Sequence, residues 1–327
     1  MRRRFALGLL LLVSAVPLFA AAKPSYQYYV VGSSSDVVRS TSPGTVLMGG
    51  GSDVDAAFQW MIGKSGGGDF VVIRASGTDA YNPYIYGLGT VDSVETLIIT
   101  SRTAASDPFV VNKIRNAEAL WIAGGDQSNY INYWKGTPVA DAINYVANTK
   151  GAPVGGTSAG LAVLGQFIYT GAAGSVTSSQ ALSNPYHRYV TLDRDFVQIA
   201  NLGGVITDSH FAARDRLGRL VTFLARIIRD GWASSVRGIG VDEATAMLVN
   251  PDGSATRVGS GAVYFLSSNG VPQVCADRTP LTYTGLAVYK VSGSATFNLA
   301  TWSGSGGTAY TVSANAGALS SSNGSIY

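Results

Sequence analysis

Cysteine, histidine and charged residues are all scarce in this 327-residue sequence. The single cysteine, Cys275, excludes an internal disulfide and a cysteine-ligated metal site. The two histidines, His187 and His210, leave only two positions for a histidine base. Only 13% of the residues are charged, and no basic run follows the N-terminal segment, so neither nucleic acid nor an anionic membrane is indicated as a partner.

The first 22 residues have the pattern of a secretory signal peptide. Three arginines precede an apolar run that a proline interrupts, and three alanines at 20–22 form a small-residue cleavage site. The Arg2-Arg3 pair leaves a twin-arginine route open beside ordinary secretion. We therefore expect a secreted or periplasmic protein. Removal of the peptide brings the formal net charge of +3 to about zero and leaves no membrane partner.

The next two thirds of the chain alternate between strand-like and helix-like segments. This alternation predicts an α/β domain over residues 23–254, with a doubly wound, mostly parallel sheet. The expected strands lie in 44–52, 69–76, 94–100, 119–126, 152–156 and 203–211, and the expected helices in 54–64, 138–150 and 217–231.

From residue 255 to 327 the composition changes to short β-prone pieces separated by glycine and serine. We expect a small C-terminal β extension packed on the main domain, with a loose tail at its end.

Ser158 lies where one apolar strand turns into a helix. The surrounding GGTSAG, residues 155–160, contains a G-x-S-x-G pentapeptide, which is typical of a nucleophile elbow. Ligands collect at the carboxyl ends of strands in an open parallel sheet, where this turn is expected. The backbone N–H of Ala159 would then face a developing oxyanion. A glycine-rich strand end with an incidental serine is the alternative.

A serine nucleophile needs a base, and His210 is the candidate. It closes the strand 203–211 and so belongs to the same sheet edge as Ser158, whereas His187 lies in a polar loop. Asp208 is two residues earlier and shares the face of His210. His210 could instead cap neighbouring backbone.

Three arginines surround the start of the next helix: Arg214, Arg216 and Arg219. The positive end of the helix dipole disfavours cations there, so a substrate carboxylate explains them better than helix stability does. Ion pairs with Asp208, Asp215 or Asp230 are the alternative.

Four stretches in order, IAGGDQ (122–127), GGTSAG, DSHFAARDRLGRL (208–220) and GIGVDEATA (238–246), resemble the serine peptidase family that holds cyanophycinase and dipeptidase E. The resemblance implies a fold like that of class I glutamine amidotransferases, and it implies neither a metal nor an organic cofactor. Cyanophycinases cut a polymer of aspartate bearing arginine side chains into β-aspartyl-arginine dipeptides. Cyanophycin or related aspartyl peptides are therefore the expected substrates, and a homodimer is expected by analogy.

The resemblance also assigns roles to residues. It makes Ser158 the nucleophile and His210 the general base, and it forms the oxyanion hole from the N–H groups of Ala159 and Asp126. The substrate pocket it implies contains Gln127, Asp208, Arg214, Arg216 and Arg219.

The third catalytic residue departs from the family pattern. The family takes its acid from shortly after the nucleophile helix, but residues 171–184 contain no carboxylate, and Gln180 is the nearest candidate. An amide oxygen can accept the imidazole N–H, as in papain-like triads. Three explanations stay open: a slow natural enzyme with Gln180 in the place of the acid, an engineered glutamate-to-glutamine change, or an acid recruited from Asp208, Glu243 or Asp193. Without an acid, a binding protein that captures aspartyl peptides is the alternative function; an esterase of the α/β-hydrolase kind is disfavoured because no histidine follows His210.

Overall fold

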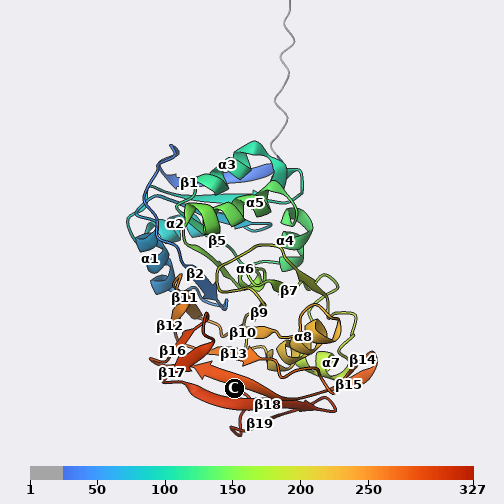
Figure 1. Ribbon diagram of the computed structural model, residues 1–327. Coiled ribbons are helices and arrows are strands. Elements are labelled where there is room, and N and C mark those ends of the chain that lie inside the picture. The colour runs from blue at the N-terminus through green and yellow to red at the C-terminus, as the bar shows by residue number, and fades with distance from the viewer. Residues whose placement is uncertain (1–24) are drawn as a thin grey trace, which may run out of the picture.

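The computed structural model describes residues 25–327 (Figure 1). The predicted signal peptide, residues 1–22, lies outside the described residues. Within 25–327, none of the helices combines the length and the apolar character that crossing a bilayer requires.

The first sheet has ten strands and extends from the upper part of Figure 1, where β1 and β5 lie, to β16 and β17 at the lower left. Its five central strands, from β4 to β2, are parallel, and the outer ones pair antiparallel. In spatial order the strands are β1 (Tyr26–Gly32), β4 (Ser93–Ile99), β3 (Asp69–Arg74), β5 (Ala119–Ile122), β6 (Val154–Thr157), β2 (Thr45–Met48), β11 (Thr245–Val249), β12 (Ser254–Gly259), β16 (Thr296–Asn298) and β17 (Ser303–Ser305).

The second sheet lies in the lower part of Figure 1, beside the end of the first sheet that holds β16 and β17, and is mainly antiparallel. Only β7, β9 and β10 pair in parallel. Its spatial order is β19 (Ala318–Ser321), β18 (Thr308–Asn315), β15 (Thr279–Val291), β13 (Val263–Ser267), β10 (Arg237–Val241), β9 (Val205–Asp208), β7 (Phe167–Tyr169) and β8 (Leu192–Arg194), with β14 (Val274–Ala276) pairing to β15.

Helices cover both faces of the first sheet and one side of the second. The long α8 is amphipathic and packs on the second sheet together with α7. The helices are α1 (Asp55–Lys64), α2 (Tyr81–Tyr86), α3 (Pro108–Asn116), α4 (Gln127–Trp134), α5 (Pro138–Tyr145), α6 (Ala159–Ala162), α7 (Ser178–Ser183) and α8 (Leu217–Arg229), with a 3₁₀ turn η1 (Ala104–Ser106) and a π turn η2 (Val146–Lys150).

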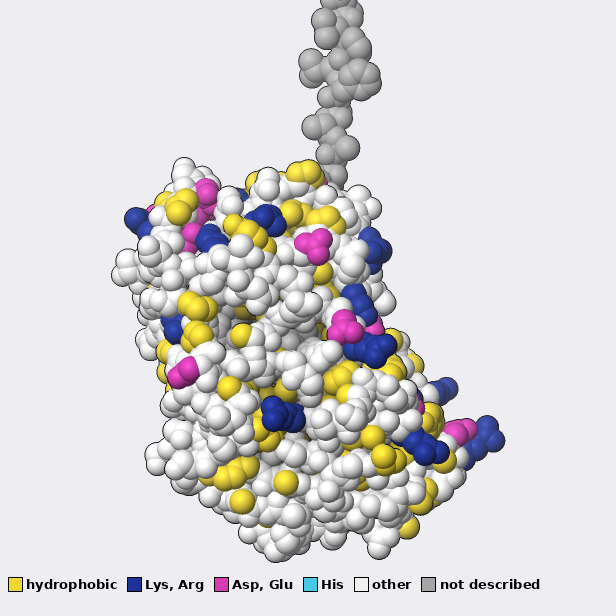
Figure 2. Space-filling view, viewed as in Figure 1, with side chains coloured by type: hydrophobic (Ala, Val, Ile, Leu, Met, Phe, Trp, Pro, Cys, Tyr) yellow, Lys and Arg dark blue, Asp and Glu magenta, His cyan; other side chains and the backbone are white. Residues whose placement is uncertain are grey.

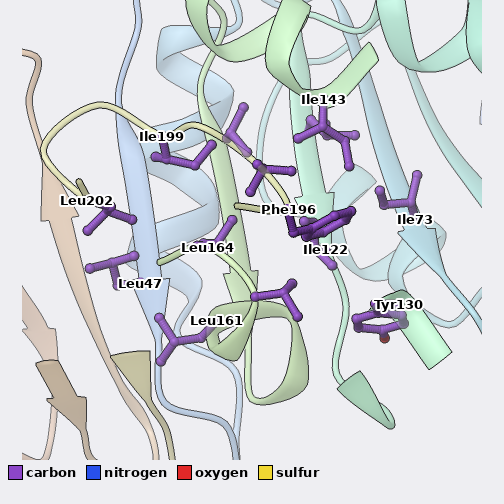
Figure 3. Close-up of a cluster of buried hydrophobic side chains, with 14 of the residues drawn as sticks. Leu47, Ile73, Ile122, Tyr130, Ile143, Leu161, Leu164, Phe196, Ile199 and Leu202 are labelled. Atoms are coloured by element: carbon purple, nitrogen blue, oxygen red, sulfur yellow. The ribbon is translucent and has the colours of Figure 1, made fainter. Parts of the chain in front are cut away.

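The parallel strands of the first sheet are apolar on both faces, because helices bury both. In β3, Val71 and Ile73 enter one cluster, while Phe70 and Val72 enter the other. Figure 3 shows part of the first cluster, where strand residues meet α4 and α5 and the loop after β8. The labelled members are Leu47, Ile73, Ile122, Tyr130, Ile143, Leu161, Leu164, Phe196, Ile199 and Leu202.

The α/β class with parallel strands is confirmed, and each predicted strand and helix has a counterpart. Two expectations are corrected. The parallel order is confined to the central strands, because β1 and β8 form antiparallel edges and every strand from β11 onward pairs antiparallel. The tail is not loose: the Tyr310 hydroxyl donates to the Ile326 carbonyl at 3.0 Å, and Tyr327 packs near the site described below.

Candidate active site

Ser158 sits on a strained turn between β6 and α6. Its φ of 52° and ψ of −111° are unusual for a residue with a side chain. Glycines make the turn possible: a Cβ on Gly160 would lie 2.0 Å from the Ile122 carbonyl oxygen, and one on Gly156 would lie 2.6 Å from Gly160. The backbone is therefore the elbow that the G-x-S-x-G pattern predicts.

His210 contacts the serine directly. Its Nε2 is 2.7 Å from the Ser158 hydroxyl oxygen, which is hydrogen-bond distance for a nucleophile and its base. The His210 backbone N–H donates to the Gly49 carbonyl at 2.8 Å and fixes the histidine against the loop after β2. A Cβ on Gly50 would lie 2.6 Å from the imidazole, so a side chain there would displace the ring.

Glu243 holds the other side of the imidazole. Its Oε1 is 2.6 Å from His210 Nδ1. The residue lies in the short connection between β10 and β11, and the Ala244 backbone N–H ties that connection to the Gly50 carbonyl at 2.9 Å. Ser158, His210 and Glu243 therefore form a continuous hydrogen-bonded chain with the geometry of a catalytic triad.

The expectation that Gln180 orients the histidine is wrong in geometry. Gln180 lies in the first turn of α7, where its Oε1 accepts from the Thr177 N–H at 3.0 Å in a capping box. A capping box has a threonine before the helix and a glutamine three residues later, as Thr177 and Gln180 are here. This pattern explains the glutamine without a catalytic role. A second proposed acid, Asp193, pairs with Lys135 at 2.7 Å.

Asp208 also does not orient the base. Its carboxylate forms a bidentate pair with Arg219, at 2.7 Å to Nε and 2.5 Å to an Nη, and both side chains are 3% exposed. Arg216 approaches the same carboxylate at 3.5 Å and donates to the Ser209 carbonyl at 2.9 Å. The ion-pair alternative thus describes Arg219 well and Arg216 in part.

Arg214 has the weakest pairing of the three arginines. Its side chain is 54% exposed, and its Nε lies 3.8 Å from Glu243 Oε1. An exposed guanidinium at that distance is free to grip another carboxylate in the adjoining pocket.

A pocket of about 300 Å³ opens beside Ser158. The first residues of α4 form one wall: Asp126 caps that helix by accepting from the Ser128 N–H, and Gln127 Nε2 donates to the Tyr169 carbonyl at 3.4 Å. All of the predicted pocket residues line it: Asp126, Gln127, Ser158, Ala159, Asp208, Arg214, Arg216 and Arg219.

The environment adjusts the titration of the imidazole. Burial lowers the pKa of His210, an effect that the Glu243 hydrogen bond opposes and that Arg214 and Arg216 add to. The hydrogen bond from His210 lowers the pKa of Glu243, so its carboxylate stays ionised. Burial also lowers the pKa of Arg216, to about 10, which leaves it protonated at neutral pH.

The second histidine lies away from this chain of contacts. His187 Nδ1 accepts from the Tyr189 N–H at 3.2 Å within a turn.

In the described part of the chain, no group of three or more His, Cys, Asp or Glu side chains could hold a metal ion. On the face drawn in Figure 2, charged side chains of both signs are scattered among uncharged ones.

The chain is similar to known peptidases. Peptidase family S51 matches residues 81–184, which include Ser158 and end before His210. A cyanophycinase of Nostoc sp. is 28% identical over 214 residues, which are 64% of this chain and 66% of that protein. A cyanophycinase of Synechococcus elongatus is 25% identical over 215 residues, 64% of this chain and 62% of that protein. The chain thus spans slightly less than two thirds of the length of these relatives.

A solved structure shares the fold. The crystal structure of a peptidase from an acI-B1 Actinobacterium superposes with a TM-score of 0.50 at 18% identity, covering 69% of this chain and 91% of that chain. These matches confirm the resemblance to the peptidase family that the sequence motifs predicted, and they support the expectation of an enzyme of the peptidase class.

Proposed function

We propose that this chain, part of which matches peptidase family S51, is a serine peptidase that cleaves aspartyl or β-aspartyl peptide bonds through an acyl-enzyme on Ser158. The observation that carries the proposal is the contact of Ser158 with His210, and of His210 with Glu243, at the mouth of an arginine-lined pocket.

In this reaction the Ser158 hydroxyl oxygen attacks the substrate carbonyl while His210 Nε2 takes its proton. Glu243 keeps Nδ1 protonated and stabilises the imidazolium that forms. The Ala159 N–H, at the start of a helix and without an intrahelical partner, would donate to the oxyanion together with the Asp126 N–H. His210 then protonates the leaving amine, and a water molecule hydrolyses the ester by the same path in reverse.

The arginines suggest the substrate class. Arg219 is buried and its charge is compensated by Asp208, so it supports the pocket wall, while Arg214 offers an unsaturated guanidinium. A substrate with a free carboxylate next to the scissile amide fits such a wall. Since the named relatives are cyanophycinases, cyanophycin is the first polymer to test. We include in the proposal secretion after signal removal and a homodimer.

The decisive experiment measures dipeptide release from cyanophycin and from β-aspartyl dipeptides by mass spectrometry. We expect the mature protein to release products and Ser158→Ala to release none, because the nucleophile is gone while the pocket remains. Ser183→Ala, which changes a serine on α7 outside the pocket, is the matched control and should keep wild-type turnover. Equal product from wild type and Ser158→Ala would refute the proposal.

The rate should depend on pH through His210. Only the neutral imidazole can accept the serine proton, and burial lowers the His210 pKa, so kcat/KM should fall only below the ordinary histidine value of about 6.5. Glu243→Gln removes a group that raises this pKa, so the residual activity should fall at still lower pH. A pH profile from 4 to 9 checks both; an acid limb above pH 7 in the wild type would contradict the assignment.

The binding-protein alternative depended on a missing acid. Glu243 supplies a carboxylate at 2.6 Å from the imidazole, so that reason no longer applies.

A further inference from the structure

Tyr327 reaches the active-site region from 110 residues farther along the chain. Its hydroxyl accepts a hydrogen bond from the Leu217 backbone N–H at 3.0 Å and donates one to Asp215 Oδ1 at 2.9 Å. These two partners bracket Arg216, so one hydroxyl clamps the turn that carries the pocket arginines.

The ring of Tyr327 is fixed by two other aromatic rings. It meets Phe211 edge-on at a centroid distance of 5.9 Å and Tyr264 at 5.8 Å. Phe211 directly follows His210 in the chain and lies over Gly240, where a Cβ would come within 2.5 Å of its ring. The Tyr310–Ile326 hydrogen bond holds the segment before Tyr327. The position of the Tyr327 hydroxyl is therefore fixed by the packing of its ring and by the hydrogen bond that holds the preceding segment.

The turn that Tyr327 contacts has a backbone that needs support. Asp215 has a φ of +49°, which is uncommon for a residue with a side chain. The Asp215 backbone carbonyl accepts from the Ser178 hydroxyl, and that hydroxyl accepts from the Arg219 backbone N–H at 3.1 Å. Tyr327 thus holds the side chain of Asp215 and Ser178 holds its backbone, between Arg214 and Arg216.

The charge on this contact stays constant at neutral pH. Burial, together with the adjacent Asp215 carboxylate, raises the pKa of the Tyr327 hydroxyl, so the group remains a protonated donor. Arg214, by contrast, has only the 3.8 Å approach to Glu243 to place its exposed side chain. Its position is therefore set mainly by the backbone of the turn.

We propose that Tyr327 is a positioning residue for substrate binding: its hydroxyl holds the turn at 214–217 so that Arg214 and Arg216 face the carboxylate of the substrate. The inference rests on the proposed function. Tyr327 touches no member of the triad, so its effect should appear in KM and not in kcat.

The test compares Tyr327→Phe with Tyr283→Phe. Both changes remove one hydroxyl from a packed ring, but the Tyr283 hydroxyl bonds Asn269 and Gly270 in the second sheet's distant loop. For a β-aspartyl dipeptide, we expect Tyr327→Phe to raise KM about five-fold, the effect of losing about one net hydrogen bond, with kcat within about two-fold. Tyr283→Phe should leave both constants unchanged.

Two further measurements separate positioning from general stability. In an Asp215→Ala background, Tyr327→Phe should raise KM by a smaller factor than in the wild type, because the Asp215 contact is already lost and only the Leu217 contact remains to be removed. Amide hydrogen exchange over 212–219 should quicken in Tyr327→Phe while exchange in β3 stays unchanged. An unchanged KM with unchanged exchange, or an equal rise in KM for Tyr283→Phe, would overturn the proposal. If the wild-type protein hydrolyses nothing, the proposed function fails, and exchange in the 212–219 segment alone decides whether Tyr327 orders the turn.

Discussion

Replacing Glu243 with glutamine is expected to lower kcat by about 10⁴-fold, the loss seen when an amide takes the place of a triad carboxylate. The amide keeps the size of the side chain but removes the charge that stabilises the imidazolium, and it can impose the wrong tautomer on His210. Steady-state kinetics on a β-aspartyl dipeptide measures the effect, and circular dichroism checks the fold.

Gln180→Glu is the matched counterpart of that variant. If Gln180 filled the place of the acid, this change would raise activity by restoring a carboxylate to the triad. Because Gln180 caps α7 and Glu243 occupies the position beside the imidazole, we expect turnover within about two-fold of wild type. Strong activation by Gln180→Glu, or full activity in Glu243→Gln, would contradict the assignment of the acid.

Removing the Asp208 carboxylate is expected to destabilise the protein rather than only its active site. Asp208→Ala leaves the guanidinium of Arg219 buried without its partner, and such losses lower the free energy of unfolding by about 3–5 kcal/mol. Urea unfolding of the Ser158→Ala background, with and without Asp208→Ala, measures the difference without any contribution from catalysis.

A double variant provides the control. Asp208→Leu with Arg219→Met removes both charges and replaces them with apolar side chains, so it should recover most of the stability that Asp208→Ala loses. If the single variant is as stable as the parent, the pair is not desolvated as its 3% exposure indicates.

Local patterns predicted the five central strands of the first sheet, because its parallel strands are apolar on both faces, but they did not predict β1 or the helices α2, α3 and α4. The division into two sheets was not predictable in this way. Whether β9 pairs with β6 or begins a new sheet is decided by tertiary packing, and the strand GGVITDSHF carries no local signal for either outcome. The short C-terminal strands likewise gain their order from sheet edges distant in sequence.

The nucleophile and base were predictable because both stand at strand ends and histidine is scarce. The first candidate for the acid, Gln180, lies too close in sequence to Ser158, and the residue beside the imidazole is Glu243, one of the three alternatives. A better signal was present: β10 is parallel to β9, with Gly240 opposite Asp208, so the residues after Val241 emerge beside His210. Applied to β10, the rule that ligands gather at carboxyl ends points to the Asp-Glu pair at 242–243.

The proposed role of Tyr327 could not be predicted from a sequence motif. A Gly/Ser-rich segment with isolated aromatics gives no indication of which surface its side chains will meet, since the partner Asp215 belongs to an irregular turn. Only the folded arrangement brings them together.

The nucleophile follows a strand of one sheet and its base follows a strand of the other, while Glu243 lies on the connection that crosses between them. The proposed hydrolysis should therefore depend on how the two sheets are aligned. A shift of about an ångström at their seam would part the serine from the imidazole while each sheet kept its own hydrogen bonds. Mild denaturant should therefore abolish the peptidase activity at a concentration below that at which the circular dichroism signal changes.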